Sequence, residues 1–252
     1  MISFIGAGPG DPELLTIKGK KLIDAADVIV YAGSLVNPKV LCNAKPSAKI
    51  YNSALMNLDE VIDIMADAEK KGMKVARVHT GDPAIYGAHR EQMDRLEALG
   101  IEFEVIPGVS SAFASAAVLK KEFTLPSVSQ TVILTRMEGR TPMPPKEKLI
   151  DLARHNATMV IFLSIGFIDE LSETLIEGGY KPETPVAVVY KASWPDQKIV
   201  IGDLTNIAEK VKEAKIEKTA LTLVGDFLGK EYDLSKLYDK KFTTEFRKGT
   251  ED

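Results

Sequence analysis

The sequence predicts two α/β domains, the first with a mainly parallel sheet and the second with a mixed sheet. In the first half, short apolar runs alternate with longer segments whose apolar residues repeat at three and four positions, as expected for strands alternating with amphipathic helices. Such alternation requires crossover connections, which produce parallel strands covered by helices. The pattern breaks at residues 120–130, and a second set of apolar runs follows.

In the first domain we expect five strands and four helices. The apolar runs predict strands at 2–5, 27–31, 48–51, 73–78 and 102–106. The intervening segments predict helices at 13–25, 58–71, 87–99 and 110–121. The helix at 58–71 shows the pattern most clearly, because one apolar stripe runs along it through Leu58, Val61, Ile62, Met65 and Ala68.

In the second domain the pattern predicts strands at 130–135, 158–163, 185–190, 197–201 and 219–225, and helices at 145–154, 167–178 and 203–213. Only the six residues KASWPD join the strands at 185–190 and 197–201. This connection is too short for a helical crossover, so the two strands should form a hairpin. We therefore expect an N-terminal domain at 1–122, a C-terminal domain at 127–230 and a charged tail at 231–252.

Composition limits the classes of function. The chain has 252 residues, of which 45% are hydrophobic and 27% charged, as in ordinary globular proteins. A net charge of −4 argues against nucleic-acid binding through overall charge. The lone Cys42 cannot form an internal disulfide, which favours a reduced, cytoplasmic setting. We expect no signal peptide, because the N-terminus has no basic region, and no membrane span, because no apolar run is long enough. We expect no metal site, because His79, His89 and His155 are scattered.

The stretch FIGAGPGDPELLT, residues 4–16, forms a glycine-rich turn between a strand and a helix. Gly6 and Gly8 match the dinucleotide fingerprint G-x-G-x-x-G, but Asp11 stands where the third glycine belongs. The second strand also lacks the acidic residue that binds a ribose, and no G-K-[ST] of a phosphate-binding loop follows. These departures argue against a nicotinamide dehydrogenase.

The same turn carries a helix start and is not isolated. Asp11 can cap a helix that begins with Pro12 and Glu13. HTGDPAIYG (79–87) and VIPGVSSAFASAA (105–117) place further glycine-containing turns after the fourth and fifth strands. Ligands bind at the carboxyl edge of open α/β sheets, so we expect the three turns to meet there.

GAGPGDPELLT, GDPAIYG, IPGVSS and the late TALTLVG, in this order, resemble the tetrapyrrole methylase family over about residues 2–228. The resemblance implies the class III methyltransferase fold, with a tetrapyrrole trough in the N-terminal domain. It also implies that S-adenosylmethionine lies in the cleft between the domains, that S-adenosylhomocysteine is released, and that the protein is a homodimer.

The resemblance also implies the site residues. The expected donor contacts are Pro9, Thr80, Gly81, Asp82, Ile85, Ser110, Ser111, Leu163, Ala192, Thr219 and Ala220. Ser110 and Ser111 could instead only cap a helix, and Leu163 could be core. We expect the tetrapyrrole, which carries many carboxylates, to contact Tyr31, Ser34, Arg90, Arg136 and Arg140. Arg90 could instead pair with Glu91 or Asp94. The sequence identifies no catalytic acid, base or nucleophile.

Within the family, YAGSLV (31–36), GDPAIYGAHREQM, GVSSAFASAA and EGRTPMPPKEK (138–148) most resemble the branch that methylates C11 of precorrin-4 or cobalt-precorrin-4 in cobalamin biosynthesis. Uroporphyrinogen-III and other precorrin C-methyltransferases are alternatives within the family. A non-catalytic corrinoid- or nucleotide-binding protein is the alternative of another class.

Overall fold

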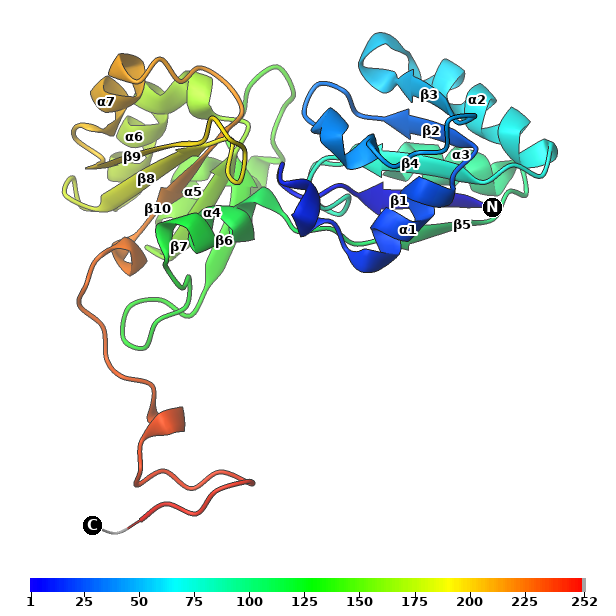
Figure 1. Cartoon of the computed structure of the whole chain (residues 1–252). Coiled ribbons are helices and arrows are strands. Elements are labelled where there is room, and N and C mark those ends of the chain that lie inside the picture. Colours follow the sequence, from blue (N-terminus) through cyan, green and yellow to red (C-terminus); the bar gives the residue numbers. More distant parts are fainter. Residues whose placement is uncertain (251–252) are drawn as a thin grey trace. The chain divides into compact units, whose positions relative to one another are not determined.

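The structure is a computed structural model that describes residues 1–250 (Figure 1). The chain forms two compact units. The first contains Met1–Ser115 and also Lys191–Gln197, and the second contains Ala116–Tyr190 and the chain from Lys198 onward. The segment Lys191–Gln197 thus belongs to the first unit, although the strands before and after it belong to the second.

The first unit contains a five-stranded sheet in which every strand is parallel to its neighbours. The strand order is β3-β2-β4-β1-β5. The strands are β1 (Ile2–Gly6), β2 (Val28–Tyr31), β3 (Lys49–Asn52), β4 (Val75–His79) and β5 (Phe103–Ile106). Each lies close to its predicted range, and the parallel arrangement is confirmed.

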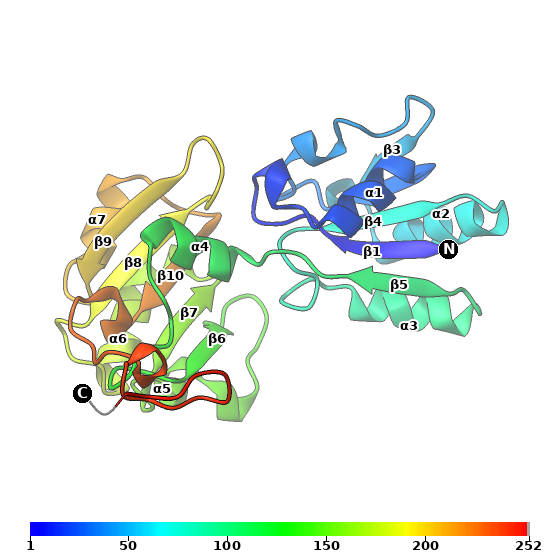
Figure 2. The ribbon, with the colours of Figure 1, turned by 60° about the horizontal axis from the view of Figure 1, so that its bottom comes forward.

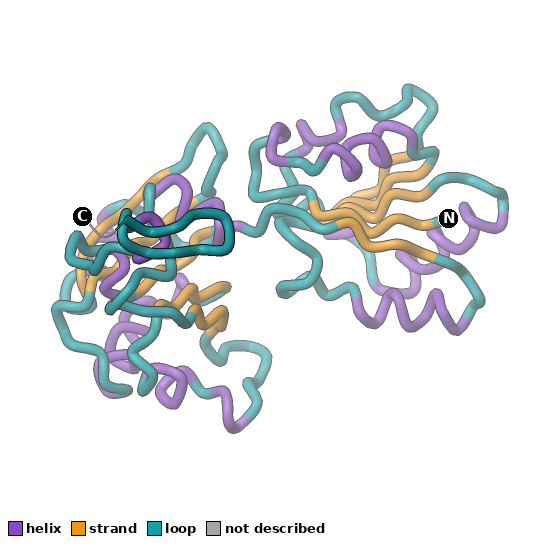
Figure 3. The backbone as a smooth tube through the Cα atoms, turned by 90° about the horizontal axis from the view of Figure 1, so that it is seen from below, coloured by secondary structure: helices purple, strands orange, loops and turns teal. Residues whose placement is uncertain are grey.

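Helices cover both faces of this sheet, as Figure 3 shows. The helices of the unit are α1 (Ile17–Ala25), α2 (Leu58–Lys70), α3 (Arg90–Ala98) and the first part of α4 (Ser111–Leu119). On one face, Phe4 packs with Met65 of α2 and Leu96 of α3. On the other face, Ile5 packs with Ile23 of α1. The alternation of side chains along β1 therefore supplies two separate cores.

The predicted helix at 13–25 is interrupted. Asp11 caps only a short 3-10 helix, Pro12–Leu14, and its side chain accepts the backbone N–H of Glu13 at 2.9 Å. Leu15 and Thr16 then adopt extended backbone angles, and Thr16 caps α1 by accepting the N–H of Gly19 at 3.1 Å. The prediction missed this second cap because a single apolar pattern runs through both segments.

The second unit contains a mixed five-stranded sheet, as predicted. The strand order is β6-β7-β10-β8-β9, which Figure 2 shows. The strands are β6 (Val132–Arg136), β7 (Thr158–Phe162), β8 (Pro185–Tyr190), β9 (Lys198–Asp203) and β10 (Ala220–Val224). β6 and β7 are parallel, whereas β10 is antiparallel to β7 and β8. β8 and β9 form the expected antiparallel hairpin.

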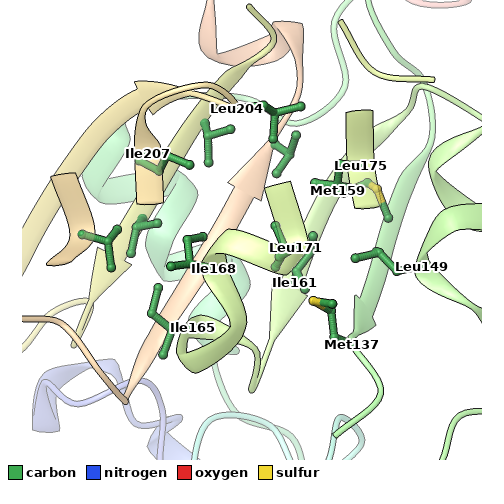
Figure 4. Packing of buried hydrophobic residues seen from close by; sticks show 14 of the residues in the cluster. Met137, Leu149, Met159, Ile161, Ile165, Ile168, Leu171, Leu175, Leu204 and Ile207 are labelled. Carbon is green, nitrogen blue, oxygen red and sulfur yellow. The ribbon is translucent and has the colours of Figure 1, made fainter. Parts of the chain in front are cut away.

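Three helices pack on one face of this mixed sheet. They are α5 (Leu149–Ala153), α6 (Ile168–Glu177) and α7 (Ile207–Glu213). Figure 4 shows Leu149 and Leu171 from these helices near Met159 and Ile161 of β7, and Ile207 of α7 belongs to the same buried cluster. Past the last strand, residues 231–250 contain only one short 3-10 helix, Lys236–Tyr238. Within residues 1–250, no helix combines the length and apolar character needed to cross a membrane.

Candidate functional site

The three glycine-containing turns of the first unit meet at the carboxyl edge of its sheet. In the parallel register, Gly6 lies beside His79, and Ile5 lies beside Ile106. Beyond the strands, Gly8 and Gly81 form an antiparallel bridge. The N–H of Gly8 donates to the carbonyl of Gly81 at 3.2 Å, and the N–H of Gly81 donates back at 2.9 Å. The expected convergence of the turns is therefore confirmed.

The glycines of these turns let the turns pack against one another. A Cβ on Gly6 would lie 2.6 Å from the Cα of Gly108 and 2.6 Å from the carbonyl oxygen of Gly81. A Cβ on Gly108 would lie 2.2 Å from that same oxygen. Gly81 differs, because its φ is +60° and a Cβ there would meet nothing closer than 3.8 Å. Gly6 and Gly108 thus let the turns pack backbone against backbone, whereas a Cβ on Gly81 would make only ordinary van der Waals contacts.

Asp82 joins the second turn to the third. One carboxylate oxygen accepts the N–H of Ala84 at 2.8 Å, and the other accepts the N–H of Gly108 at 2.9 Å. The carbonyl of Asp82 also accepts the N–H of Ile85 at 3.3 Å. A carboxylate that accepts backbone N–H groups makes strong hydrogen bonds, so Asp82 holds the shape of both turns.

Ser110 caps the helix that follows the third turn. Its side-chain oxygen accepts the N–H of Ala112 at 3.3 Å, and its carbonyl accepts the N–H of Ala114 at 3.1 Å. Ser110 is buried, whereas Ser111, the first residue of α4, is half-buried. Thr80, the residue between β4 and Gly81, is also half-buried. Capping thus accounts for the Ser110 side chain in the structure.

A cluster of buried polar side chains lies next to the second turn and hydrogen-bonds to the backbone at its end. Arg77 Nε donates to Gln92 Oε1 at 2.9 Å, and Gln92 Nε2 donates to the carbonyl of Ala88 at 2.9 Å.

His79 stacks on Phe4, with 5.9 Å between ring centroids. Burial lowers the pKa of His79 to about 3, with further lowering by the charges of Arg77 and His89. His79 is therefore neutral at neutral pH. Burial also lowers the pKa of Arg77 to about 10.

Two of the expected tetrapyrrole contacts lie around the carboxyl end of β2. Tyr31 is the last residue of β2 and is half-buried, and its carbonyl accepts the hydroxyl of Ser53 at 3.1 Å. Ser34 is exposed in the turn that follows. Both positions belong to the carboxyl edge where the glycine turns meet, because β2 pairs with β4 in parallel register.

In the second unit, expected donor residues gather at one edge of the mixed sheet. Thr222 pairs with Ile161 in antiparallel register, so Ala220, at the start of β10, and Leu163, just after the end of β7, lie toward the same edge of the sheet. Leu163 has a left-handed φ of 54°, and its side chain is 65% exposed, so it is not a core residue. Thr219, with a φ of 58°, precedes β10 at the same edge. An exposed leucine in this conformation is costly and typical of functional sites.

The segment that holds the expected donor residue Ala192 also contacts Pro9, through Trp194, which sequence reasoning did not assign to the site. Ala192 is buried and belongs to Lys191–Gln197, which is part of the first unit rather than the second. In the same segment, the indole N–H of Trp194 donates to the carbonyl of Pro9 at 2.9 Å. Pro9 thus takes part in the turn as an acceptor. The single tryptophan within a short polar connection was the signal available in the sequence.

The three expected arginines have different surroundings. Arg90 is exposed and pairs with Asp94 at 2.7 Å, which is the alternative considered from the sequence. The guanidinium of Arg136 donates to the carbonyls of Met137, Thr141 and Pro142 at 3.0, 3.1 and 2.9 Å, so it organises its own loop. Arg140 is exposed and has no hydrogen-bond or ion-pair partner within the described residues.

Comparisons with known proteins agree with this geometry. The chain is 64% identical over 248 residues to a cobalt-precorrin-4 C(11)-methyltransferase of Methanocaldococcus jannaschii, covering 98% of this chain and 96% of that protein. The X-ray structure of a cobalt precorrin-4 methyltransferase, a cobalamin biosynthetic enzyme, matches with a TM-score of 0.89 and 47% identity, covering 91% of this chain and 96% of that one.

A second solved structure, uroporphyrin-III C-methyltransferase of Thermus thermophilus in complex with S-adenosylhomocysteine, matches with a TM-score of 0.75 and 28% identity, covering 90% of this chain and 98% of that one. The family model for tetrapyrrole (corrin/porphyrin) methylases matches residues 1–208. The match spans all of the first unit and most of the second sheet. The chain belongs to the tetrapyrrole methylase family and has the fold of its solved members.

Proposed function

We propose that this protein transfers a methyl group from S-adenosylmethionine to C11 of precorrin-4 or cobalt-precorrin-4 during cobalamin biosynthesis. The observation that carries this proposal is the 64% identity, over 98% of the chain, to a cobalt-precorrin-4 C(11)-methyltransferase. Relatives named as uroporphyrin(ogen)-III methyltransferases are less similar, at 36% identity for the enzyme of Methanosarcina barkeri and 28% for that of Thermus thermophilus. Cobalt, when present, belongs to the substrate.

The donor contacts are proposed for each unit separately. In the first unit they are Pro9, Thr80, Gly81, Asp82, Ile85, Ser110, Ser111 and Ala192. In the second unit they are Leu163, Thr219 and Ala220. Two observations fit such a donor. Gly81 carries no side chain where a Cβ would have no neighbour closer than 3.8 Å, and Leu163 offers an exposed apolar surface to an adenine ring.

The chemistry places few demands on the protein. S-adenosylmethionine, when bound, supplies an activated methyl group that the ring carbon takes by direct displacement, as the carbon–sulfur bond breaks. No nucleophile from the protein is required. The contribution of the chain is to align the two reactants and to exclude water. The rigid, mutually hydrogen-bonded turns around Gly81 and Asp82 suit that role.

The tetrapyrrole contacts follow from its acetate and propionate groups. Arg140 is the strongest candidate for pairing with a carboxylate, because its guanidinium is exposed and unpaired within the described chain. Arg136 supports this loop through three carbonyls. Tyr31, Ser34 and Arg90 remain proposed contacts.

We also propose a homodimer in a cytoplasmic setting. The edge strand β9 exposes two large apolar side chains, Ile199 at 39% and Ile201 at 63%, which a second copy could cover. The free thiol of Cys42 fits a reducing compartment. Light scattering at micromolar protein should give about twice the chain mass of 27.5 kDa. A monomer under those conditions would contradict the dimer.

The function is tested by incubating the protein with S-adenosylmethionine and one tetrapyrrole at a time. Precorrin-4, cobalt-precorrin-4 and uroporphyrinogen III form the three arms, with mass spectrometry of the product. We expect a product heavier by one methyl group in one or both of the first two arms. Methylation of uroporphyrinogen III alone would favour the other family activity. Binding without turnover in any arm would favour a non-catalytic binding protein.

A further inference from the structure

The segment Lys191–Gln197 is held in shape by its own side chains. Lys191 and Ser193 adopt left-handed φ angles of 46° and 70°, which cost free energy for residues other than glycine. The N–H of Ser193 donates to Gln197 Oε1 at 2.7 Å. Lys191 Nζ lies 2.6 Å from Asp196 Oδ2 and 5.2 Å from the centre of the Trp194 ring. The segment is therefore a preformed support rather than a loose connection.

The segment Lys191–Gln197 hydrogen-bonds to two backbone groups of the first glycine turn. The indole N–H of Trp194 donates to the carbonyl of Pro9 at 2.9 Å. The hydroxyl of Ser193 accepts the backbone N–H of Asp11 at 3.0 Å. Pro9 is buried, so its carbonyl would lose a partner that water could not easily replace if the indole were removed.

Gly10, between these two residues, fixes the position of the indole ring. A Cβ on Gly10 would lie 2.0 Å from Nε1 and 2.1 Å from Cδ1 of Trp194, so the ring packs directly on the glycine backbone. On its other side, the carbonyl of Gly10 accepts the side-chain N–H of Asn37 at 2.8 Å in a buried setting. Three consecutive residues of the turn thus each have a side-chain partner from a distant part of the chain.

We propose that Trp194 is a positioning residue for the methyl donor, acting through Pro9 on one side and through Ala192, two residues away in the same segment, on the other. This inference rests on the proposed function, because both neighbours are proposed donor contacts. Trp194 touches the turn, not the reacting atoms. It is also the single tryptophan of the chain, so its fluorescence reports on this turn alone.

The central test compares wild type with Trp194→Phe, which keeps an aromatic ring but removes the N–H donor. Calorimetry should show S-adenosylhomocysteine affinity reduced about fivefold to tenfold, the equivalent of about 1–1.4 kcal/mol. The KM for S-adenosylmethionine should rise in step, while kcat at saturation stays within about twofold. Tyr238→Phe, in the exposed tail, is the control and should change none of these values.

Two further measurements keep the test decisive. Ser193→Ala removes the bond to Asp11 and should weaken S-adenosylhomocysteine binding in the same direction. In the wild type, titration with S-adenosylhomocysteine should change the Trp194 emission with the same midpoint as calorimetry. The inference would be overturned, and the proposed function left standing, if Trp194→Phe and Ser193→Ala both bound S-adenosylhomocysteine as tightly as the wild type. The same holds if Trp194 emission stayed unchanged while calorimetry recorded binding. Absence of S-adenosylhomocysteine binding to the wild type would overturn the proposed function and this inference with it.

Discussion

The carboxylate of Asp82 accepts the backbone N–H of Gly108 at 2.9 Å, which joins the turn after β4 to the turn after β5. The two residues are 26 positions apart in the chain. This bond, the bridge between Gly8 and Gly81, and the close approach of Gly6 to Gly108 make one rigid edge from three turns. A rigid edge is what a reaction controlled by alignment requires.

Replacing Asp82 should loosen this edge. Asp82→Ala removes the acceptors for Ala84 and Gly108, and we expect the free energy of unfolding to fall by about 1.5–3 kcal/mol, the range for hydrogen bonds to a charged group. S-adenosylhomocysteine affinity should fall as well, because both turns carry proposed donor contacts. Urea unfolding and calorimetry measure the two effects.

The control for this variant is Asp203→Ala, which removes a carboxylate that accepts the N–H of Thr205 in the second unit. It should reduce stability without altering donor affinity. If Asp82→Ala also left the affinity unchanged, the turns would not need this carboxylate to bind the donor.

Gly81 allows the proposed donor approach to be separated from backbone strain. Gly81 and Gly72 both have left-handed φ angles, +60° and +70°, and neither would place a Cβ within 3.4 Å of another atom. Alanine at either position should lower the free energy of unfolding by about 1–2 kcal/mol. Only Gly81→Ala should also weaken S-adenosylhomocysteine binding, by about tenfold or 1.4 kcal/mol. Equal affinities in the two variants would remove Gly81 from the donor site.

Arg140 should affect the tetrapyrrole and not the donor. We expect Arg140→Ala to reduce kcat/KM for the tetrapyrrole by about 10-fold to 100-fold, since a partly desolvated charge pair is worth about 1.5–3 kcal/mol and a solvated one less. S-adenosylhomocysteine affinity should stay within about twofold.

The matched control for Arg140 is Arg154→Ala, which removes an exposed arginine paired with Asp151 in the same unit. It should leave both constants unchanged. An equal loss of donor affinity in Arg140→Ala would place this arginine at the donor instead, and no loss of either constant would leave it without a role in binding.

The buried His79 predicts a pH dependence of stability. Folding lowers its pKa from 6.5 to about 3, mainly through burial, so the folded protein favours the neutral imidazole. Below pH 6.5 the unfolded chain binds a proton at His79 that the folded protein does not bind. The free energy of unfolding is therefore highest above pH 6.5 and falls as the pH drops below it. Between about pH 6.5 and pH 5, His79 alone should reduce the free energy of unfolding by up to about 1.4 kcal/mol per pH unit.

His89, whose pKa burial also lowers, adds to the same slope. Urea unfolding of the wild type and of His79→Gln at several pH values measures the contribution of His79. The slope in this range should be clearly smaller in His79→Gln. Identical slopes in the two proteins would show that His79 does not titrate on unfolding as the buried environment requires.

The sequence was sufficient to predict the elements whose signals are local. Apolar runs identified the strands, and the six-residue connection after β8 correctly required a hairpin. Boundaries were missed where a second local signal lay inside one apolar pattern, as with the Thr16 cap that separates α1 from the preceding 3-10 helix. Left-handed residues Tyr86 and Ala88 likewise delay the start of α3 to Arg90.

The meeting of the three glycine-containing turns was predictable from the sequence, but the contacts within and around them were not. Parallel strands bring their carboxyl ends to one edge, so the meeting of the three turns followed from the alternation of elements. Gly6 and Gly108 must be glycines because turns that are distant in sequence pack against each other there, and no local sequence pattern shows such a contact. The packing of Trp194 on Gly10 and the carbonyl bonds of Arg136 depend on tertiary structure in the same way.

The most direct measurement of the central claim uses S-adenosylmethionine carrying a carbon-13 label in its methyl group. The labelled donor is incubated with precorrin-4 and, separately, with cobalt-precorrin-4, and carbon NMR locates the label in the product. Our account predicts a single labelled methyl group bonded to C11 in at least one of the two products. Label at another ring carbon, or no labelled product from either substrate with a protein that binds S-adenosylhomocysteine, would contradict it.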